Sequence, residues 1–198
     1  MKQIKKITNF DSNQVNPFFY DRLKKSFNSG IEEFQKELDS LIHKDEEATI
    51  KTTLFFLNST NRISRLFELV ISSDLFLNKM LKSSYYHKNG FDKIVLLQSN
   101  SFKIRIHNFD PTYISDKNIH DHRWLFGSTI LKGSFEMSLY NENDYEGEKR
   151  FKNTYESSGK VTNDGYVYLK ERENLLMHQG MSYFMPTEEL HDIKGISS

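Results

Sequence analysis

The spacing of apolar residues changes near residue 84. Before that point they recur every three or four positions, as on one face of an α-helix. This period predicts helices over about residues 31–42, 46–56, 63–71 and 74–80, within a helical segment that spans residues 17–84. Ser29 and Glu32 have the spacing of a capping box at the start of the first of these helices. Residues 1–16 are polar and are predicted to form an irregular lead-in.

After the Asn89-Gly90 turn signal the period becomes two, which is typical of β-strands. In the strand predicted over residues 101–109, Phe102, Ile104 and Ile106 share one face, and Arg105 and His107 share the other. The other strands are predicted over residues 93–98, 124–132, 134–140 and 166–170 and from Gly180 onward, where residues 175–179 lead into the last strand. Turns are predicted at Lys132-Gly133 and Asn163-Asp164-Gly165, and a polar loop over 141–147.

Many short strands separated by turn signals are typical of an all-β barrel. We therefore expect a mainly β fold in which residues 85–198 form the barrel. The preceding helical segment, residues 17–84, should pack on one side of it.

The candidate chemistry lies in three histidines. His120 and His122 are two residues apart, so a β-strand would place both imidazoles on the same face. A second block turns at Gly180, runs apolar to Pro186 and delivers His191. Because imidazole is the commonest protein metal ligand, the three histidines are predicted to bind one metal ion.

The two blocks resemble the paired motifs of the cupin superfamily, small double-stranded β-helix (jelly-roll) barrels that bind a metal in their mouth. The first family motif is H-x-H, then a Glu, then a Gly. His120, His122 and Gly133 match it, while Gly127 stands where the Glu ligand would be. In the second motif Gly180, Pro186 and His191 match, and Glu188 replaces an inner Gly.

A cupin with three histidines and no Glu resembles the thiol dioxygenases of the cysteine dioxygenase type. This resemblance implies a non-haem Fe(II) dioxygenase that adds O2 to a small thiol or amino-acid-like substrate. Zn, Ni or Mn would instead indicate a non-oxidative isomerase, lyase or hydrolase, in which the metal acts as a Lewis acid. The third hypothesis is a cupin-fold binding protein without catalysis. A homodimer is also expected from the resemblance, since cupins are often dimers.

The resemblance also suggests substrate contacts. The stretch from Tyr86 to Lys88 is similar to the family's substrate-binding segment, with Lys88 in place of an Arg that grips a carboxylate. Arg105 and His107 share a strand face, and they would be rival contacts for an anion if that face points into the barrel. Four aromatic residues are expected to wall the pocket or to place a hydroxyl near the metal: Trp124, Tyr140, Tyr168 and Tyr183.

Composition narrows the function further. The 27 basic and 27 acidic residues cancel, so there is no electrostatic case for nucleic acid. No run of 18 apolar residues suggests a membrane span, and no apolar stretch near the start suggests a signal peptide. The absence of cysteine excludes disulfides and thiolate ligands and is consistent with the cytoplasm, where we expect the protein to reside.

Overall fold

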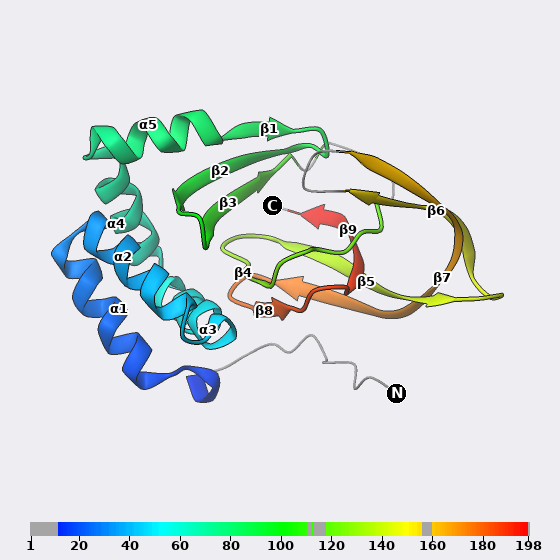
Figure 1. Cartoon of the computed structure of the whole chain (residues 1–198), viewed down its shortest axis with the longest axis horizontal. Helices are drawn as coiled ribbons and strands as arrows, with labels where there is room; N and C mark the ends of the chain where they lie inside the picture. The colour runs from blue at the N-terminus through cyan, green and yellow to red at the C-terminus, as the bar shows by residue number, and fades with distance from the viewer. Residues whose placement is uncertain (1–11, 111, 113–117, 156–159, 198) are drawn as a thin grey trace.

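The computed structural model describes residues 12–110, 112, 118–155 and 160–197. A region of five α-helices comes first and β-sheets follow, one of them curled into a half-barrel (Figure 1). The fold is therefore a mixture of α and β structure. The helices are α1 (Pro17–Ser29), α2 (Ile31–Ile42), α3 (Glu46–Leu57), α4 (Thr60–Ile71) and α5 (Asp74–Ser83), with a short 3-10 turn over Ser12–Gln14.

The four sequence-predicted helices correspond to α2 to α5, but the predicted capping box is wrong. Helix α1 continues through Ser29, whose hydroxyl donates to the carbonyl of Lys25 at 3.1 Å. The only residue between α1 and α2 is Gly30, which makes the reversal with a φ of 122° that favours glycine. Side-chain caps are found instead at Asp45 and Ser59, which accept from backbone N–H groups of α3 and α4.

The helices share their core with a three-stranded antiparallel sheet. This sheet contains β1 (Tyr85–His87), β2 (Phe91–Gln98) and β3 (Lys103–Phe109). Ile104 and Ile106 pack against the helical core, which contains buried side chains of all five helices. The predicted alternation of β3 is confirmed, because Arg105 lies on the opposite face. That face is turned toward the rest of the β structure.

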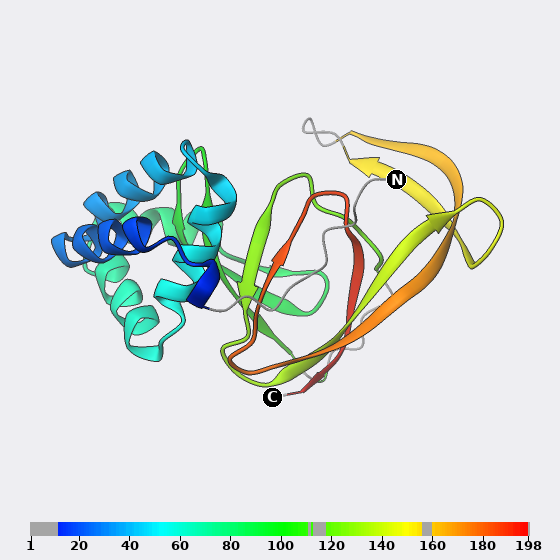
Figure 2. The ribbon, with the colours of Figure 1, turned by 90° about the horizontal axis from the view of Figure 1, so that it is seen from below.

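The remaining strands form the curled half-barrel and a two-stranded sheet beside it (Figure 2). Strand β4 (Phe126–Thr129) pairs with β8 (Ser182–Met185). The four-stranded sheet has the order β6-β7-β5-β9. Its strands are β5 (Ser134–Asn143), β6 (Glu148–Tyr155), β7 (Val161–His178) and β9 (Leu190–Ser197). A second hydrophobic core fills the concave side, made mainly of Ile130, Phe135, Met137, Leu139, Met177, Tyr183 and Met185.

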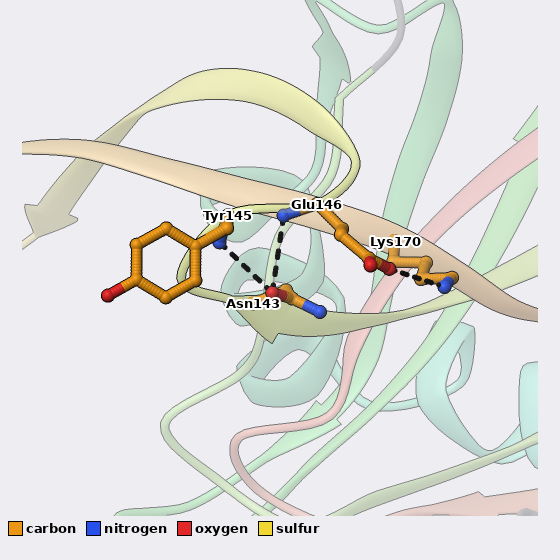
Figure 3. Close-up of polar contacts among 4 residues, drawn as sticks. All are labelled: Asn143, Tyr145, Glu146 and Lys170. Carbon is orange, nitrogen blue, oxygen red and sulfur yellow. Dashed lines mark hydrogen bonds and ion pairs between the residues drawn. The ribbon is translucent and has the colours of Figure 1, made fainter.

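The loop predicted over residues 141–147 is shorter in the structure, because β5 extends to Asn143 and β6 begins at Glu148. Figure 3 shows how the turn closes: the side-chain oxygen of Asn143 accepts from the backbone N–H groups of Tyr145 and Glu146 at 3.0 and 3.2 Å. The carboxylate of Glu146 then pairs with Lys170 of β7 at 2.9 Å.

The turn predicted at Asn163-Asp164-Gly165 lies inside β7, which runs for 18 residues. Phe151 of β6 pairs with Tyr166 of β7, and Asn153 pairs with Asn163. One residue of β6 but two residues of β7 lie between these pairs, so β7 holds one extra residue. This is a β-bulge, and Gly165 supplies its left-handed residue with a φ of 87°. The glycine signal marked the backbone conformation correctly but did not mark a chain reversal.

Candidate metal centre

The site forms where two segments 71 residues apart meet, 191 minus 120. His120 and His191 make an isolated antiparallel bridge with backbone N–O distances of 3.0 and 2.9 Å. Next to it, the carboxylate of Asp192 accepts from the backbone N–H of Asn118 at 3.1 Å. His191 belongs to β9, whereas His120 and His122 lie in the irregular segment before β4. The predicted strand through both of these histidines is therefore wrong.

The imidazoles nevertheless converge. The ring centroids of His120 and His191 are 4.5 Å apart, and the ring of His122 lies 5.0 and 5.1 Å from them. One ligand nitrogen of each residue lies within 4.8 Å of the others. Two nitrogens that each bind one ion at ~2.1 Å lie at most ~4.2 Å apart, so small side-chain rotations would complete the site.

Backbone carbonyls select the nitrogen that each of two histidines can offer. The Nδ1 atom of His120 lies 2.9 Å from the carbonyl oxygen of Asn118. The Nδ1 atom of His191 lies 3.1 Å from the carbonyl oxygen of Glu189. Because a carbonyl can only accept, both Nδ1 atoms must carry the proton and donate. Each Nε2 is then left with a free lone pair, the arrangement found in metal-binding histidines.

Burial keeps two of the three imidazoles uncharged. Removal from solvent, and then the charges of His191, His120 and the nearby cations Arg105 and Lys93, lower the pKa of His122 to about 3. The same two causes, burial and His120, lower the pKa of His191 to about 4. Both imidazoles therefore hold no second proton near neutral pH and are ready to bind a cation. The set of donors fits a divalent ion of the Fe, Zn or Ni type.

Aromatic side chains bound the cluster on one side. The ring of Phe126 lies 4.6 Å from the ring of His122 and 6.3 Å from that of His191. Trp124 lies 5.8 Å from His122 and is 45% exposed, so it stands at the mouth of the site. Among the residues that the structure describes, the three histidines are grouped without a carboxylate.

Gly127 does not face the histidines, which corrects its interpretation as a vacated ligand position. A Cβ atom at this position would meet the Cδ1 atom of Leu54, and it would lie 2.9 Å from Cγ2 of Ile50 in the same helix, α3. The glycine therefore lets α3 approach β4 closely. Phe126, one residue earlier, is the side chain that occupies the cluster's side of β4.

The turn before His191 keeps a backbone conformation that suits glycine. Glu188, which replaces the inner Gly of the motif, has a φ of 67° and is the only non-glycine residue with positive φ in the described part of the chain. Such a conformation is costly for a side chain with a Cβ atom. The geometry of the turn is thus retained although the glycine is not.

The predicted substrate contacts divide into two groups. The guanidinium of Arg105 lies 5.9 Å from the ring of Trp124, next to the histidine cluster. His107 lies on the same strand face, 4.7 Å from the ring of Phe91. Burial, and then the nearby charges of Lys93 and Arg105, lower the pKa of His107 to about 4, although the residue is exposed. Lys88 and Tyr86 are exposed at the β1–β2 turn.

The three predicted tyrosines lie apart from the histidine rings. Tyr140 pairs with Leu190 and so lies on the opposite face of the sheet from His191. Tyr168 pairs with Asn143 at the far end of β5. Tyr183 is buried behind Phe126, with ring centroids 6.1 Å apart, and burial raises the pKa of its hydroxyl to about 12.

Sequence reasoning missed several residues around the cluster. Lys93 of β2 lies on the same face of the sheet as Arg105 of β3, and the positive charge of Lys93 lowers the pKa of His122. Glu189 is buried, forms an ion pair with Arg172 at 2.8 Å, and carries the carbonyl that fixes His191. Strand pairing could have found Lys93, because it lies opposite His107. No pattern in the sequence predicts the ion pair between Glu189 and Arg172.

Comparison with protein-family models, with curated proteins and with solved structures finds no match for this chain. Within the described residues, no helix is long and apolar enough to cross a membrane. The molecule itself provides a three-histidine cluster that could hold a metal ion, set in a curled half-barrel.

Proposed function

We propose that His120, His122 and His191 bind one Fe(II) ion, and that the half-barrel is a cupin barrel of the thiol dioxygenase type. The proposed substrate is a small thiol or an amino-acid-like molecule, and reaction of a thiol with O2 gives a sulfinate. The observation that supports it most is the convergence of the three imidazoles, one nitrogen of each within 4.8 Å of the others, with the Nδ1 atoms of His120 and His191 held by backbone carbonyls.

The charge of the donor set favours an anionic substrate. Three neutral imidazoles leave the full charge of a divalent ion uncompensated, because the described cluster includes no carboxylate. A substrate thiolate would supply the missing negative charge. When bound, Fe(II) supplies open positions for substrate and O2 together and the redox chemistry that joins them. Both oxygen atoms go to sulfur, which loses four electrons to O2, so no further reductant is needed.

The surrounding residues have separate tasks. Phe126 and Trp124 keep water away from one side of the imidazoles. Arg105, whose guanidinium lies next to the ring of Trp124, draws the anionic part of a substrate toward the cluster. His120 and His191 hold their Nδ1 protons on carbonyls, which keeps their other nitrogens aimed at the ion.

The test is elemental analysis of protein purified without oxygen, with the wild type beside His122→Ala and His178→Ala. His178 is an exposed histidine at the end of β7 and serves as a matched control. We expect about one Fe per chain in the wild type and in the control, and its loss in His122→Ala. O2 consumption in step with loss of added thiol would then support the dioxygenase.

Other outcomes select the alternatives. Zn, Ni or Mn at the same ratio, without O2 uptake, would move the function to a non-oxidative isomerase, lyase or hydrolase. No metal in the wild type, even after Fe(II) is added, would overturn the proposal and leave a binding protein.

A further inference from the structure

A pocket of about 240 Å³ opens on the face of the β1–β2–β3 sheet that is turned away from the helical core. Since one water takes ~30 Å³ in the liquid, the pocket has room for an ion of several heavy atoms. Its polar lining consists of Ser83, Tyr85, Lys93, Gln98, Lys103 and Arg105.

The lining has positive charge and no negative charge. Lys103 and Arg105 lie two residues apart on β3, Lys93 lies on the neighbouring strand β2 opposite His107, and none of the lining residues is acidic. Among the described residues, no carboxylate lies within ion-pair distance of these three side chains. Arg105 is partly buried, and burial lowers the pKa of its guanidinium, opposed only by Tyr85. Three cations held together without an acid are unfavourable unless an anion joins them.

The two hydroxyl groups of the pocket are arranged as donors. Lys93 donates to the hydroxyl oxygen of Tyr85 at 3.2 Å. The side-chain amide of Gln98 donates to the hydroxyl oxygen of Ser83 at 2.6 Å. Since each oxygen already accepts a hydrogen bond, each O–H proton remains for another acceptor. The pocket therefore combines three cations with two hydroxyl donors.

We propose that this pocket binds a phosphate-type oxyanion, carrying two negative charges, through Lys93, Lys103 and Arg105. A single carboxylate would balance only one of the three cations. A dianion with several oxygens could accept from the guanidinium, from both ammonium groups and from the hydroxyls at once. The ligand is either free phosphate or the phosphate group of a larger molecule.

The pocket lies beside the histidine cluster but includes none of the three histidines. The ring of Trp124 is 5.9 Å from the guanidinium of Arg105 and 5.8 Å from the ring of His122. Binding of the oxyanion therefore needs no metal, although Arg105 is also the residue proposed above to draw an anionic substrate toward the cluster.

The test is calorimetric titration of the metal-free full chain with inorganic phosphate, at constant ionic strength set with chloride. We compare the wild type with Arg105→Gln, Lys103→Gln and the control Lys24→Gln on the exposed side of α1. Loss of one charged hydrogen bond should weaken phosphate binding by about tenfold in each pocket variant. The control should bind as the wild type does. Because Lys103 is exposed, its replacement keeps the test valid even if Arg105→Gln folds poorly.

A phosphomonoester, O-phosphoserine, identifies the source of the anion. Equal affinity for both probes supports free phosphate, and at least tenfold tighter binding of the ester, about 1.4 kcal/mol, supports a phosphorylated ligand. Two results would overturn the inference: no phosphate binding by the wild type, or binding that both pocket variants retain in full.

Discussion

Arg172 of β7 donates at 2.8 Å to the carboxylate of Glu189, which lies two residues before His191 in the chain. The Glu189 side chain is only 8% exposed, while its backbone carbonyl accepts the Nδ1 proton of His191 at 3.1 Å. Arg172 also donates to Asn141 of β5 at 3.2 Å. The pair thus connects the curled sheet to the turn that orients a cluster histidine.

Replacing Arg172 should destabilise the protein strongly. Arg172→Gln leaves the buried carboxylate of Glu189 without its cation, which costs about 3 kcal/mol by analogy with other broken buried pairs. Urea denaturation of the two proteins measures this difference. The matched control is Arg65→Gln, which breaks the exposed pair with Glu68 and should cost at most about 1 kcal/mol. Equal losses in the two variants would contradict the structural role of the buried pair.

Gly127→Ala should lower the free energy of unfolding by about 1–3 kcal/mol, because the new methyl group would overlap side chains of α3. Thermal and chemical denaturation measure the loss. Leu54 is the principal obstacle, so Leu54→Ala should offset part of the penalty. The double variant should then lose less than the sum of the single losses, by about 1 kcal/mol. Strict additivity would mean that position 127 does not face α3.

Glu188→Gly should stabilise the turn before His191. Glycine adopts a φ of 67° without strain, so a gain of up to about 1 kcal/mol is expected at this position. The neighbouring change Thr187→Gly serves as control, because Thr187 has an ordinary φ and glycine there only adds disorder to the unfolded chain. A drop in melting temperature for Glu188→Gly, equal to that of the control, would refute this reading of the turn.

The metal-free protein should lose stability as the pH falls through the weakly acidic range. The pKa of His191 is about 4 in the folded state, against an ordinary value of 6.5. Between these values the unfolded chain binds a proton that the folded chain does not, so unfolding becomes easier as the pH falls. The contribution is complete at neutral pH and is lost by pH ~4, with a magnitude on the order of 3 kcal/mol.

The measurement is the unfolding free energy at several pH values in the presence of a chelator. His191→Ala should have a shallower dependence on pH than the wild type, while His178→Ala should match the wild type. Identical slopes for wild type and His191→Ala would contradict the lowered pKa.

The sequence was sufficient to locate four of the five described helices and to identify the three histidines, but it did not locate α1. Apolar residues at helical spacing located α2 to α5, since a helix that packs on one side must repeat its buried positions. The H-x-H pair and the third histidine after the Gly-to-Pro stretch were brought together as expected, at 4.5 to 5.1 Å between rings.

The failures arose where tertiary contacts override local signals. Gly165 has turn chemistry, but pairing with β6 absorbs its left-handed backbone as a bulge in a long strand. His120 and His122 were assigned to one strand, yet their convergence depends on a bridge to a segment far along the chain. The surroundings of Gly127 are set by its contact with α3, and no local sequence pattern around β4 predicts that contact.

The chain has a single tryptophan, Trp124, and it stands where the helix-backed sheet meets the half-barrel. The two layers have separate hydrophobic cores, so each can loosen without the other. Trp124 touches both sides of that boundary through Arg105 and His122. The fluorescence of Trp124 consequently reports on the boundary between the two layers without an added dye. It can follow separation of the layers, quenching by a bound metal, or anion binding beside Arg105.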